Sequence, residues 1–278
     1  MSLHIEPIAG ALGAEVSGLD LAAPLDPARL QDLRQALLDH QVLIVRDQDL
    51  QPAALRDLGR RFGDLVIHPN LIAEGEFPEV ITIRKTPKDR AVVGGEWHTD
   101  TTCLANPPMG AILHARILPP VGGDTLFASQ YLAYETLSDG MKRMLEGLRA
   151  VHNDTRVAGP GARLNARRAS KVREDDAWRP TESLHPVIRT HPETGRRSLF
   201  VNIAYTRRFE NMTEAESEPL LEYLYAHATR PEFTCRIRWS PGAVVFWDNR
   251  CLMHIALNDY PGHTREMIRV QIVGDRPH

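Results

Sequence analysis

The stretch WDNRCLMHIAL, residues 247–257, decides the fold that we expect for this chain. Short apolar runs at 243–247 and 251–257 are typical of buried strands. The polar residues between the runs predict a turn with a local ion pair, which positions the second strand. His254 lies inside that second strand, where burying an unpaired imidazole is costly. The stretch therefore predicts neighbouring strands and a histidine that either binds a ligand or is hydrogen-bonded to the backbone.

The same short apolar pattern recurs along the chain and predicts a β-rich centre. Further strands are expected at 42–45, 80–83, 111–116, 233–239 and 265–273, and a hairpin at 186–202 with Gly195 in its turn. Helical spacing predicts helices at 27–40, 53–61 and 214–228, and one at 131–148 that Gly140 can interrupt. Strands at the centre with helices at their flanks predict a mainly β, α+β fold, either a barrel or a jelly roll.

Nothing in the sequence divides the chain into parts. It has no Ser/Gly linker, no block of like charges and no internal repeat, so we expect a single domain over residues 1–278. Residues 158–180 are basic, punctuated by Gly and Pro, and without a clear period. This segment is expected to be a solvated surface loop or an active-site lid.

The composition argues against several classes of protein. A formal net charge of −3, and the lack of a basic stripe interleaved with aromatic residues, disfavour nucleic-acid binding. No apolar run reaches the roughly 18 residues of a membrane span, and the start MSLHIEPIAG lacks the pattern of a secretory signal. We therefore expect a cytoplasmic protein that does not bind membranes.

Cysteine chemistry is not expected to carry the function. The three cysteines, Cys103, Cys235 and Cys251, include no CxxC pair, which disfavours both a disulfide framework and a zinc knuckle. Cys103 and Cys251 lie near candidate ligands in the sequence. We expect them to be small buried core residues, with a ligand or redox role as the alternative.

The segment WHTD, residues 97–100, offers a pair of metal ligands. Residues two apart in an extended segment point the same way, so His98 and Asp100 can bind one ion. Non-haem iron oxygenases hold their metal with two histidines and one carboxylate, which leaves other positions open. His254 is the best candidate for the third ligand, and a core histidine is the alternative.

A second HxD motif at residues 152–154 shows that the bare motif is not specific. It follows a predicted helix directly and precedes Thr155 and Arg156. Asn and Asp in that position are typical of a turn. We therefore expect His152 to lie in an ordinary turn rather than at a metal.

Two arginines on the last predicted strand indicate an anion site. Arg265 and Arg269 are four residues apart, so both lie on the same face of a strand, together with Met267 and Gln271. If that face points inward, the guanidinium groups need anionic partners, and arginine suits carboxylates. The alternative is a surface face with salt bridges.

At this point the residues resemble a known family, the taurine and phenoxy-acid dioxygenases. The matching motifs occur in family order from about residue 5 to residue 277. They are WHTD at 97–100, PPVGGDTLF at 119–127, LHPVIRTHPETGRRSLFVN at 184–202, WDNRCLMH at 247–254, and the R-x3-R of Arg265 and Arg269. The resemblance implies a double-stranded β-helix core, of the jelly-roll or cupin kind. It also implies an enzyme that uses Fe(II), 2-oxoglutarate and O2.

Carried over by motif, the resemblance implies roles for individual residues. His98, Asp100 and His254 match the iron ligands. Thr125 and Arg265 match the residues that hold the distal carboxylate of 2-oxoglutarate. Arg269 and His68 match residues at the anionic group of the substrate, and Tyr205 matches an aromatic wall residue.

The sequence departs from the taurine enzymes at two positions of the substrate pocket. They have a tyrosine where this chain has Leu71, and an asparagine where it has Gly94. Both changes remove polar partners for a small amino-sulfonate and predict a more apolar or roomier pocket. Taurine itself is therefore not the expected substrate.

The reaction that the resemblance implies is hydroxylation of a carbon beside the heteroatom of a small organic anion, with formation of succinate and CO2. The anion is an alkyl sulfonate, a sulfate ester or an aryloxyalkanoate, and C–S or C–O cleavage follows. Relatives form dimers or tetramers, so a homo-oligomer is expected. Two other functions use the same residues: a zinc hydrolase with a His/Asp/His site, and a non-catalytic barrel that binds small anions.

Overall fold

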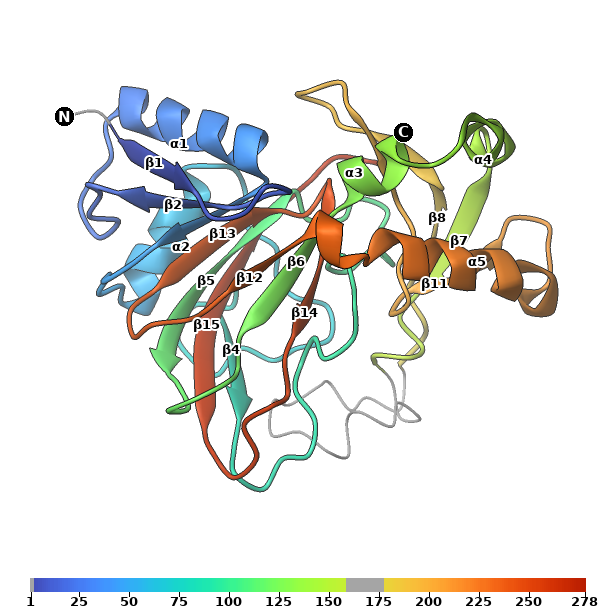
Figure 1. The fold of residues 1–278 in the computed structure, drawn as a ribbon. Coiled ribbons are helices and arrows are strands. Elements are labelled where there is room, and N and C mark those ends of the chain that lie inside the picture. The colour runs from blue at the N-terminus through green and yellow to red at the C-terminus, as the bar shows by residue number, and fades with distance from the viewer. Residues whose placement is uncertain (1–2, 159–177) are drawn as a thin grey trace.

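The computed structural model describes residues 3–158 and 178–278. Its largest element is a seven-stranded, mostly antiparallel sheet (Figure 1). In spatial order the strands are β1 (His4–Pro7), β2 (Ala14–Ser17), β3 (Val42–Val45), β13 (Val244–Asp248), β5 (Gly110–Ile117), β15 (Arg265–Ile272) and β4 (Ile81–Lys85). Only the pair β2–β3 is parallel among these neighbours. Strands from both ends of the chain therefore meet in one sheet.

A second, three-stranded sheet packs against the large one. It consists of β12 (Thr234–Ile237), β6 (Thr125–Ser129) and β14 (Leu252–Ala256), with β6 in the middle. One apolar cluster contains side chains of both sheets, including Phe127, Val245 and Met267. The two sheets thus share a core, and β14 and β15 carry His254, Arg265 and Arg269 into the space between them.

Helices cover the outer sides of this core. Helix α1 (Pro27–His40) and α2 (Pro52–Arg60) pack on the large sheet around a second apolar cluster (Figure 1). Asp26 caps α1 by accepting a hydrogen bond from the Arg29 amide, with proline at the first turn. Helix α5 (Glu214–Ala228) lies on the other side of the molecule and begins with a capping box formed by Thr213 and Glu216.

Two small sheets complete the described structure, the first next to α5 and the second next to α3 (Gln130–Glu135). The first contains β11 (Thr206–Phe209), β7 (Arg149–Asn153) and β8 (Glu182–Pro186), and the second contains β10 (Arg197–Leu199) and β9 (Ile188–Thr190). A short 3-10 helix, Pro231–Phe233, precedes β12. The β9–β10 pair confirms the predicted hairpin, including Gly195 in its turn at a φ of +69°.

The segment predicted as a helix at 131–148 forms two short helices, and the predicted break is wrong only in its place. They are α3 (Gln130–Glu135) and α4 (Asp139–Leu145). Ser138 has an extended backbone and its hydroxyl accepts a hydrogen bond from the Met141 amide, so it starts a new helix. The break therefore comes before Gly140 rather than at it.

The interpretation of His152 as a turn residue is also wrong. His152 lies in β7 and is fully buried, with its Nδ1 atom 2.9 Å from the Thr102 hydroxyl. The turn begins one residue after the strand, where the Asp154 carbonyl accepts hydrogen bonds from the amides of Val157 and Ala158. His152 is in a strand because β7 pairs with β8 and β11. The turn propensity of neighbouring residues carries no information about such long-range pairing.

Two further expectations concern the periphery. Of the loop or lid predicted at 158–180, residues 159–177 lie outside the described residues. No helix among the described residues has the length and apolarity needed to cross a bilayer.

Candidate active site

The three predicted metal ligands lie together. His98, Asp100 and His254 each offer a ligand atom, and these atoms lie within 4.8 Å of one another, all buried. His98 and His254 come from segments far apart in the sequence, yet their backbones exchange both amide hydrogen bonds, at 3.0 and 2.8 Å. The pairing places the two imidazole rings 4.1 Å apart between centroids.

Each of the two histidines can offer a ring nitrogen to a metal. The Nδ1 atom of His98 lies 2.7 Å from the Glu96 carbonyl oxygen, which only accepts, so Nδ1 carries the proton and Nε2 is left to bind a metal. Burial, with the neighbouring His98, lowers the pKa of His254 to about 3. With this pKa the imidazole of His254 is neutral at neutral pH. The neutral form is the one that binds a metal.

Asp100 supplies the negative charge of the cluster. Burial alone would raise its pKa, but Arg269 and the two histidines outweigh this and hold the pKa well below its usual value. Its Oδ1 atom accepts a hydrogen bond from Arg269 Nη1 at 3.3 Å. Its buried Oδ2 atom has no hydrogen-bond partner among the described residues. Two imidazoles and a carboxylate with an unsatisfied oxygen are a donor set that fits Fe(II).

Arg265 and Thr125 form a second polar end of the site. The Trp239 indole N–H donates to the Thr125 hydroxyl at 3.0 Å, and the Arg265 guanidinium lies 5.6 Å from the centroid of a Trp239 ring. Arg265 Nε donates to the Gly123 carbonyl at 3.1 Å, while its buried Nη2 has no partner among the described residues. A buried guanidinium with an unsatisfied donor beside a hydroxyl fits a carboxylate such as that of 2-oxoglutarate.

The predicted inward face of β15 is confirmed. Arg265 and Arg269 are only 6% and 5% exposed, and both point into the same pocket. The alternative of an exposed face with salt bridges is therefore wrong. Arg269 lies at the Asp100 end of this face, and its buried Nε has no partner among the described residues.

One pocket brings together every site residue that the sequence predicted. It encloses about 1010 Å³, a volume that includes its opening to solvent. The predicted residues in its lining are His68, Leu71, Gly94, His98, Asp100, Thr125, Tyr205, His254, Arg265 and Arg269. Several further lining residues are apolar, among them Ile83, Val93 and Ala204. The pocket therefore has charged ends and a largely apolar wall.

His68 lines this wall in a defined tautomer. Its Nδ1 atom accepts hydrogen bonds from the amides of Asn70 and Leu71, at 3.1 and 2.9 Å, so its proton is on Nε2. Burial raises the pKa of the Tyr205 hydroxyl well above its usual value, which keeps the phenol neutral.

A glycine at position 94 is required by the backbone conformation as well as by the space in the pocket. Its φ is +77°, and a Cβ atom there would lie 2.9 Å from Cε1 of the His98 ring. Its carbonyl accepts a hydrogen bond from the Ala256 amide at 2.8 Å, which fastens the segment to the end of β14. The glycine therefore allows the chain to pass closely over a predicted metal ligand.

The cysteines behave as expected of core residues. Cys103, Cys235 and Cys251 are all free and buried. Burial raises the pKa of Cys103 and of Cys235 to about 12, so neither thiol is ionised at neutral pH. None of the three belongs to the described metal cluster.

Sequence reasoning missed several partners of the site. Asn249 bonds to the backbone of Asp100, and the Glu96 carbonyl fixes the His98 tautomer. Asn70 lines the pocket and donates to the buried carboxylate of Asp154 at 3.0 Å. The motif WDNR contained a signal for Asn249, but a backbone carbonyl such as that of Glu96 leaves no trace in residue identity.

Comparison with known proteins adds an independent line of support. The profile of the family described as "Taurine catabolism dioxygenase TauD, TfdA family" matches residues 4–271. An alkylsulfatase from Acinetobacter baylyi is 34% identical, over 98% of this chain and 86% of that protein. An (S)-phenoxypropionate/alpha-ketoglutarate dioxygenase from Sphingobium herbicidovorans is 32% identical, over 99% of this chain and 96% of that protein.

The fold is also similar to solved structures. A crystal structure of a taurine dioxygenase from Burkholderia xenovorans superimposes with a TM-score of 0.82 and 36% sequence identity, covering 100% of this chain and 91% of that one. These matches favour the oxygenase interpretation over the zinc hydrolase and the non-catalytic barrel.

Proposed function

This chain belongs to the TauD, TfdA family of dioxygenases, and we propose that it oxidises a small organic anion that has an apolar body. Family membership makes it a 2-oxoglutarate-dependent dioxygenase, an oxidoreductase that uses Fe(II) and O2. The observation that carries the proposal is the single pocket, in which the His/Asp/His cluster, two buried arginines and an apolar wall meet.

His98, Asp100 and His254 are the proposed iron ligands. Their burial, their mutual distances and the unsatisfied Asp100 Oδ2 support this assignment. When bound, Fe(II) with 2-oxoglutarate supplies the O2-activating chemistry, and the protein supplies binding and orientation. The Glu96 carbonyl holds the His98 ring so that Nε2 faces the cluster.

Arg265 and Thr125 are the proposed site for the distal carboxylate of 2-oxoglutarate. Trp239 supports both residues, by its indole N–H to Thr125 and by its ring beside the Arg265 guanidinium. Charge-assisted hydrogen bonds from a buried arginine are worth roughly 1.5–3 kcal/mol. The cosubstrate would thus be oriented with its keto-acid end toward the His/Asp/His cluster.

The substrate is proposed to bind on the other side of the cluster. Arg269, with His68, supplies positive and N–H donor groups for its anionic end. Leu71 and Tyr205 supply the apolar wall, and Gly94 keeps space open beside His98. Orientation by these residues would place the carbon beside the heteroatom at the cluster, so that its hydroxylation leads to C–S or C–O cleavage.

The remaining proposals concern the frame of the site. The two facing sheets, joined by a shared core, support a double-stranded β-helix. Strands from both ends of the chain in one sheet support a single domain over residues 1–278. The family resemblance supports a homo-oligomer, a dimer or tetramer, and we propose that the protein acts in the cytoplasm.

A substrate panel tests this function. We expect alkyl sulfate esters, medium-chain alkyl sulfonates or one enantiomer of a phenoxypropionate to support succinate formation in equal amount with the cleaved product. Taurine is expected to be at least about 10-fold poorer as a substrate, because burying its ammonium group against an apolar wall costs about 1.4 kcal/mol or more. Succinate and released sulfite, sulfate or phenol are measured together. Succinate without matching product for every compound would contradict the proposed substrate class.

Arg265→Ala is expected to raise the KM for 2-oxoglutarate by about 10- to 100-fold, the factor that corresponds to one charge-assisted hydrogen bond. The affinity for the metal alone should stay the same. Arg236→Ala is the matched control, since Arg236 pairs with Asp124, next to Thr125, but is outside the pocket lining. Equal KM values for both variants would overturn the assignment of Arg265.

A further inference from the structure

We propose that Asn249 is a positioning residue that holds the backbone of Asp100 so that its carboxylate faces the metal. The inference rests on the proposed metal site and goes beyond it. Asn249 is fully buried in the turn between β13 and β14. Its Oδ1 accepts a hydrogen bond from the Asp100 amide at 2.8 Å, and its Nδ2 donates to the Asp100 carbonyl at 3.1 Å.

The Asn249 carboxamide thus forms with the Asp100 backbone the pair of hydrogen bonds that a neighbouring strand would form. Every residue of the segment 98–100 is fastened to the same stretch of chain. His98 pairs with the His254 backbone, and the Thr99 hydroxyl donates to the Leu252 carbonyl at 3.0 Å. Asp100 is the one member whose backbone is held by a side chain. Its position therefore depends on residue identity at 249, whereas the backbone of His98 is held by main-chain hydrogen bonds to His254.

Only an amide of this length satisfies the arrangement. Asn249 must accept from one N–H group and donate to the Asp100 carbonyl and to the Pro108 carbonyl, the latter at 3.0 Å. Aspartate keeps the shape but has no N–H groups, so it would oppose two carbonyl oxygens with a negative charge. Alanine would leave the buried Asp100 amide and carbonyl without partners.

The next residue shows why Asp100 needs support. Thr101 has a φ of +44°, an unfavourable backbone conformation for a β-branched side chain. Such strain persists only where the surroundings hold the backbone in place. The two hydrogen bonds between Asn249 and the Asp100 backbone lie immediately before Thr101 and offset part of the free-energy cost of its backbone conformation.

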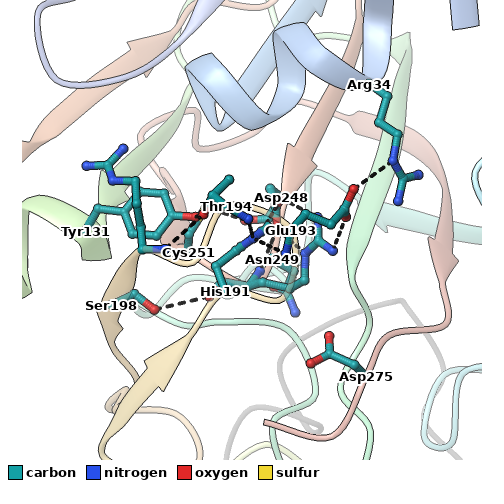
Figure 2. Close-up of polar contacts among 12 residues, drawn as sticks. Arg34, Tyr131, His191, Glu193, Thr194, Ser198, Asp248, Asn249, Cys251 and Asp275 are labelled. Carbon is teal, nitrogen blue, oxygen red and sulfur yellow. Dashed lines mark hydrogen bonds and ion pairs between the residues drawn. The ribbon is translucent and has the colours of Figure 1, made fainter. Parts of the chain in front are cut away.

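A buried ion-pair network fixes Asn249 in turn. Asp248 accepts hydrogen bonds from Arg250 at 2.9 and 2.7 Å, and from His191 Nε2 at 3.0 Å. Arg250 reaches on to Glu193, at 2.6 Å, in the β9–β10 hairpin. Figure 2 shows Asp248, His191 and Glu193 of this network, with Arg34 of helix α1 bonded to Glu193. The turn that carries Asn249 is therefore held by side chains that are not members of the metal cluster.

Asn249→Ala tests the proposal through metal binding rather than activity alone. The dissociation constant for Co(II), with its visible spectrum as the signal, is measured anaerobically for the folded apoproteins. We expect about 10- to 100-fold weaker binding, the loss typical for partners that orient a metal ligand, and a changed Co(II) spectrum. Asn249→Asp should bind Co(II) no better than Asn249→Ala.

Gln48→Ala is the matched control. Gln48 is a buried amide that also accepts from one backbone N–H, that of Leu21, and donates to two carbonyls, those of Leu19 and Arg46. Its side chain does not contact the metal ligands among its described hydrogen bonds. Gln48→Ala should lower the melting temperature as Asn249→Ala does, but leave Co(II) affinity and spectrum unchanged.

The outcomes separate this inference from the proposed function. Wild-type protein that binds no Co(II) would refute the metal site itself. Wild-type binding with unchanged affinity and spectrum in Asn249→Ala would refute only the role of Asn249. If the alanine variant does not fold, Asn249→Ser, whose hydroxyl and a water can occupy the space, is measured in its place with the same expectation.

Discussion

His254→Ala is expected to abolish metal-dependent succinate formation. The loss of a ligand should weaken Fe(II) binding by more than the roughly 10- to 100-fold typical of an outer partner. The His254 backbone still pairs with that of His98 in the variant, so the fold of the ligand segment should persist. Succinate yield and bound iron per chain are measured on the same preparation. Wild-type succinate production with bound iron in this variant would show that the ligand assignment is wrong.

His114→Ala provides the control for removing a buried histidine from a strand. His114 is 2% exposed on β5, and its Nε2 atom lies 3.1 Å from the Gln48 carbonyl. It is not among the residues that line the pocket. We expect this variant to lose stability but to keep wild-type metal affinity. Equal loss of iron from both variants would attribute the effect to the fold rather than to His254.

The contrast between the two HxD motifs shows how far the sequence alone leads. His98 and His152 share the same local pattern, and both are buried. His98 reaches a carboxylate and a second histidine, because the chain folds back through the 98–254 backbone pairing. His152 instead contacts Thr102, and its ring stacks with Phe200, so it is packed in the interior and not at the metal cluster. Long-range strand pairing separates the two, and no short window contains it.

Strands that lack an apolar run were also beyond prediction. Strands β1 and β2 contain charged or polar residues and form one edge of the large sheet. Strand β6, TLFAS, is the middle strand of the three-stranded sheet and was not predicted as a strand. Its Thr125 was identified only as part of the motif at residues 119–127. By contrast, the two faces of β15 could be predicted from the sequence, because side chains alternate between the faces of a strand and Arg265 and Arg269 therefore lie together. That face lines the pocket. Predictability thus follows from how much of an element's environment is encoded in its own residues.

The site was more predictable than the fold for a related reason. Ligands and arginines are chosen for their own chemistry, so their identities appear in the sequence. Their supports are often backbone atoms, such as the carbonyls of Glu96 and Gly123. Any residue type supplies a carbonyl, and only coordinates reveal which one is used.

Arg250→Met is expected to cost about 3–5 kcal/mol of unfolding free energy, the loss typical when one partner of a buried ion pair is removed. The variant leaves the carboxylate of Asp248 buried, with His191 as its remaining side-chain partner. Burial alone would raise the pKa of Asp248, and Arg250 is the main group that holds this pKa below its usual value. Chemical denaturation at neutral pH measures the loss.

Two comparisons isolate the buried charge as the cause. Arg60→Met breaks the Arg60–Glu79 pair, in which Arg60 is 51% exposed, and should cost less than about 1 kcal/mol. Adding Asp248→Asn to Arg250→Met should recover part of the lost stability, because it removes the stranded negative charge, whereas Asp248→Asn alone should destabilise. If the double variant were as unstable as the sum of the two single ones, packing of the Arg250 side chain rather than charge would hold the turn. The arrangement of Asn249 would then depend on the shape of the network and not on its ion pairs.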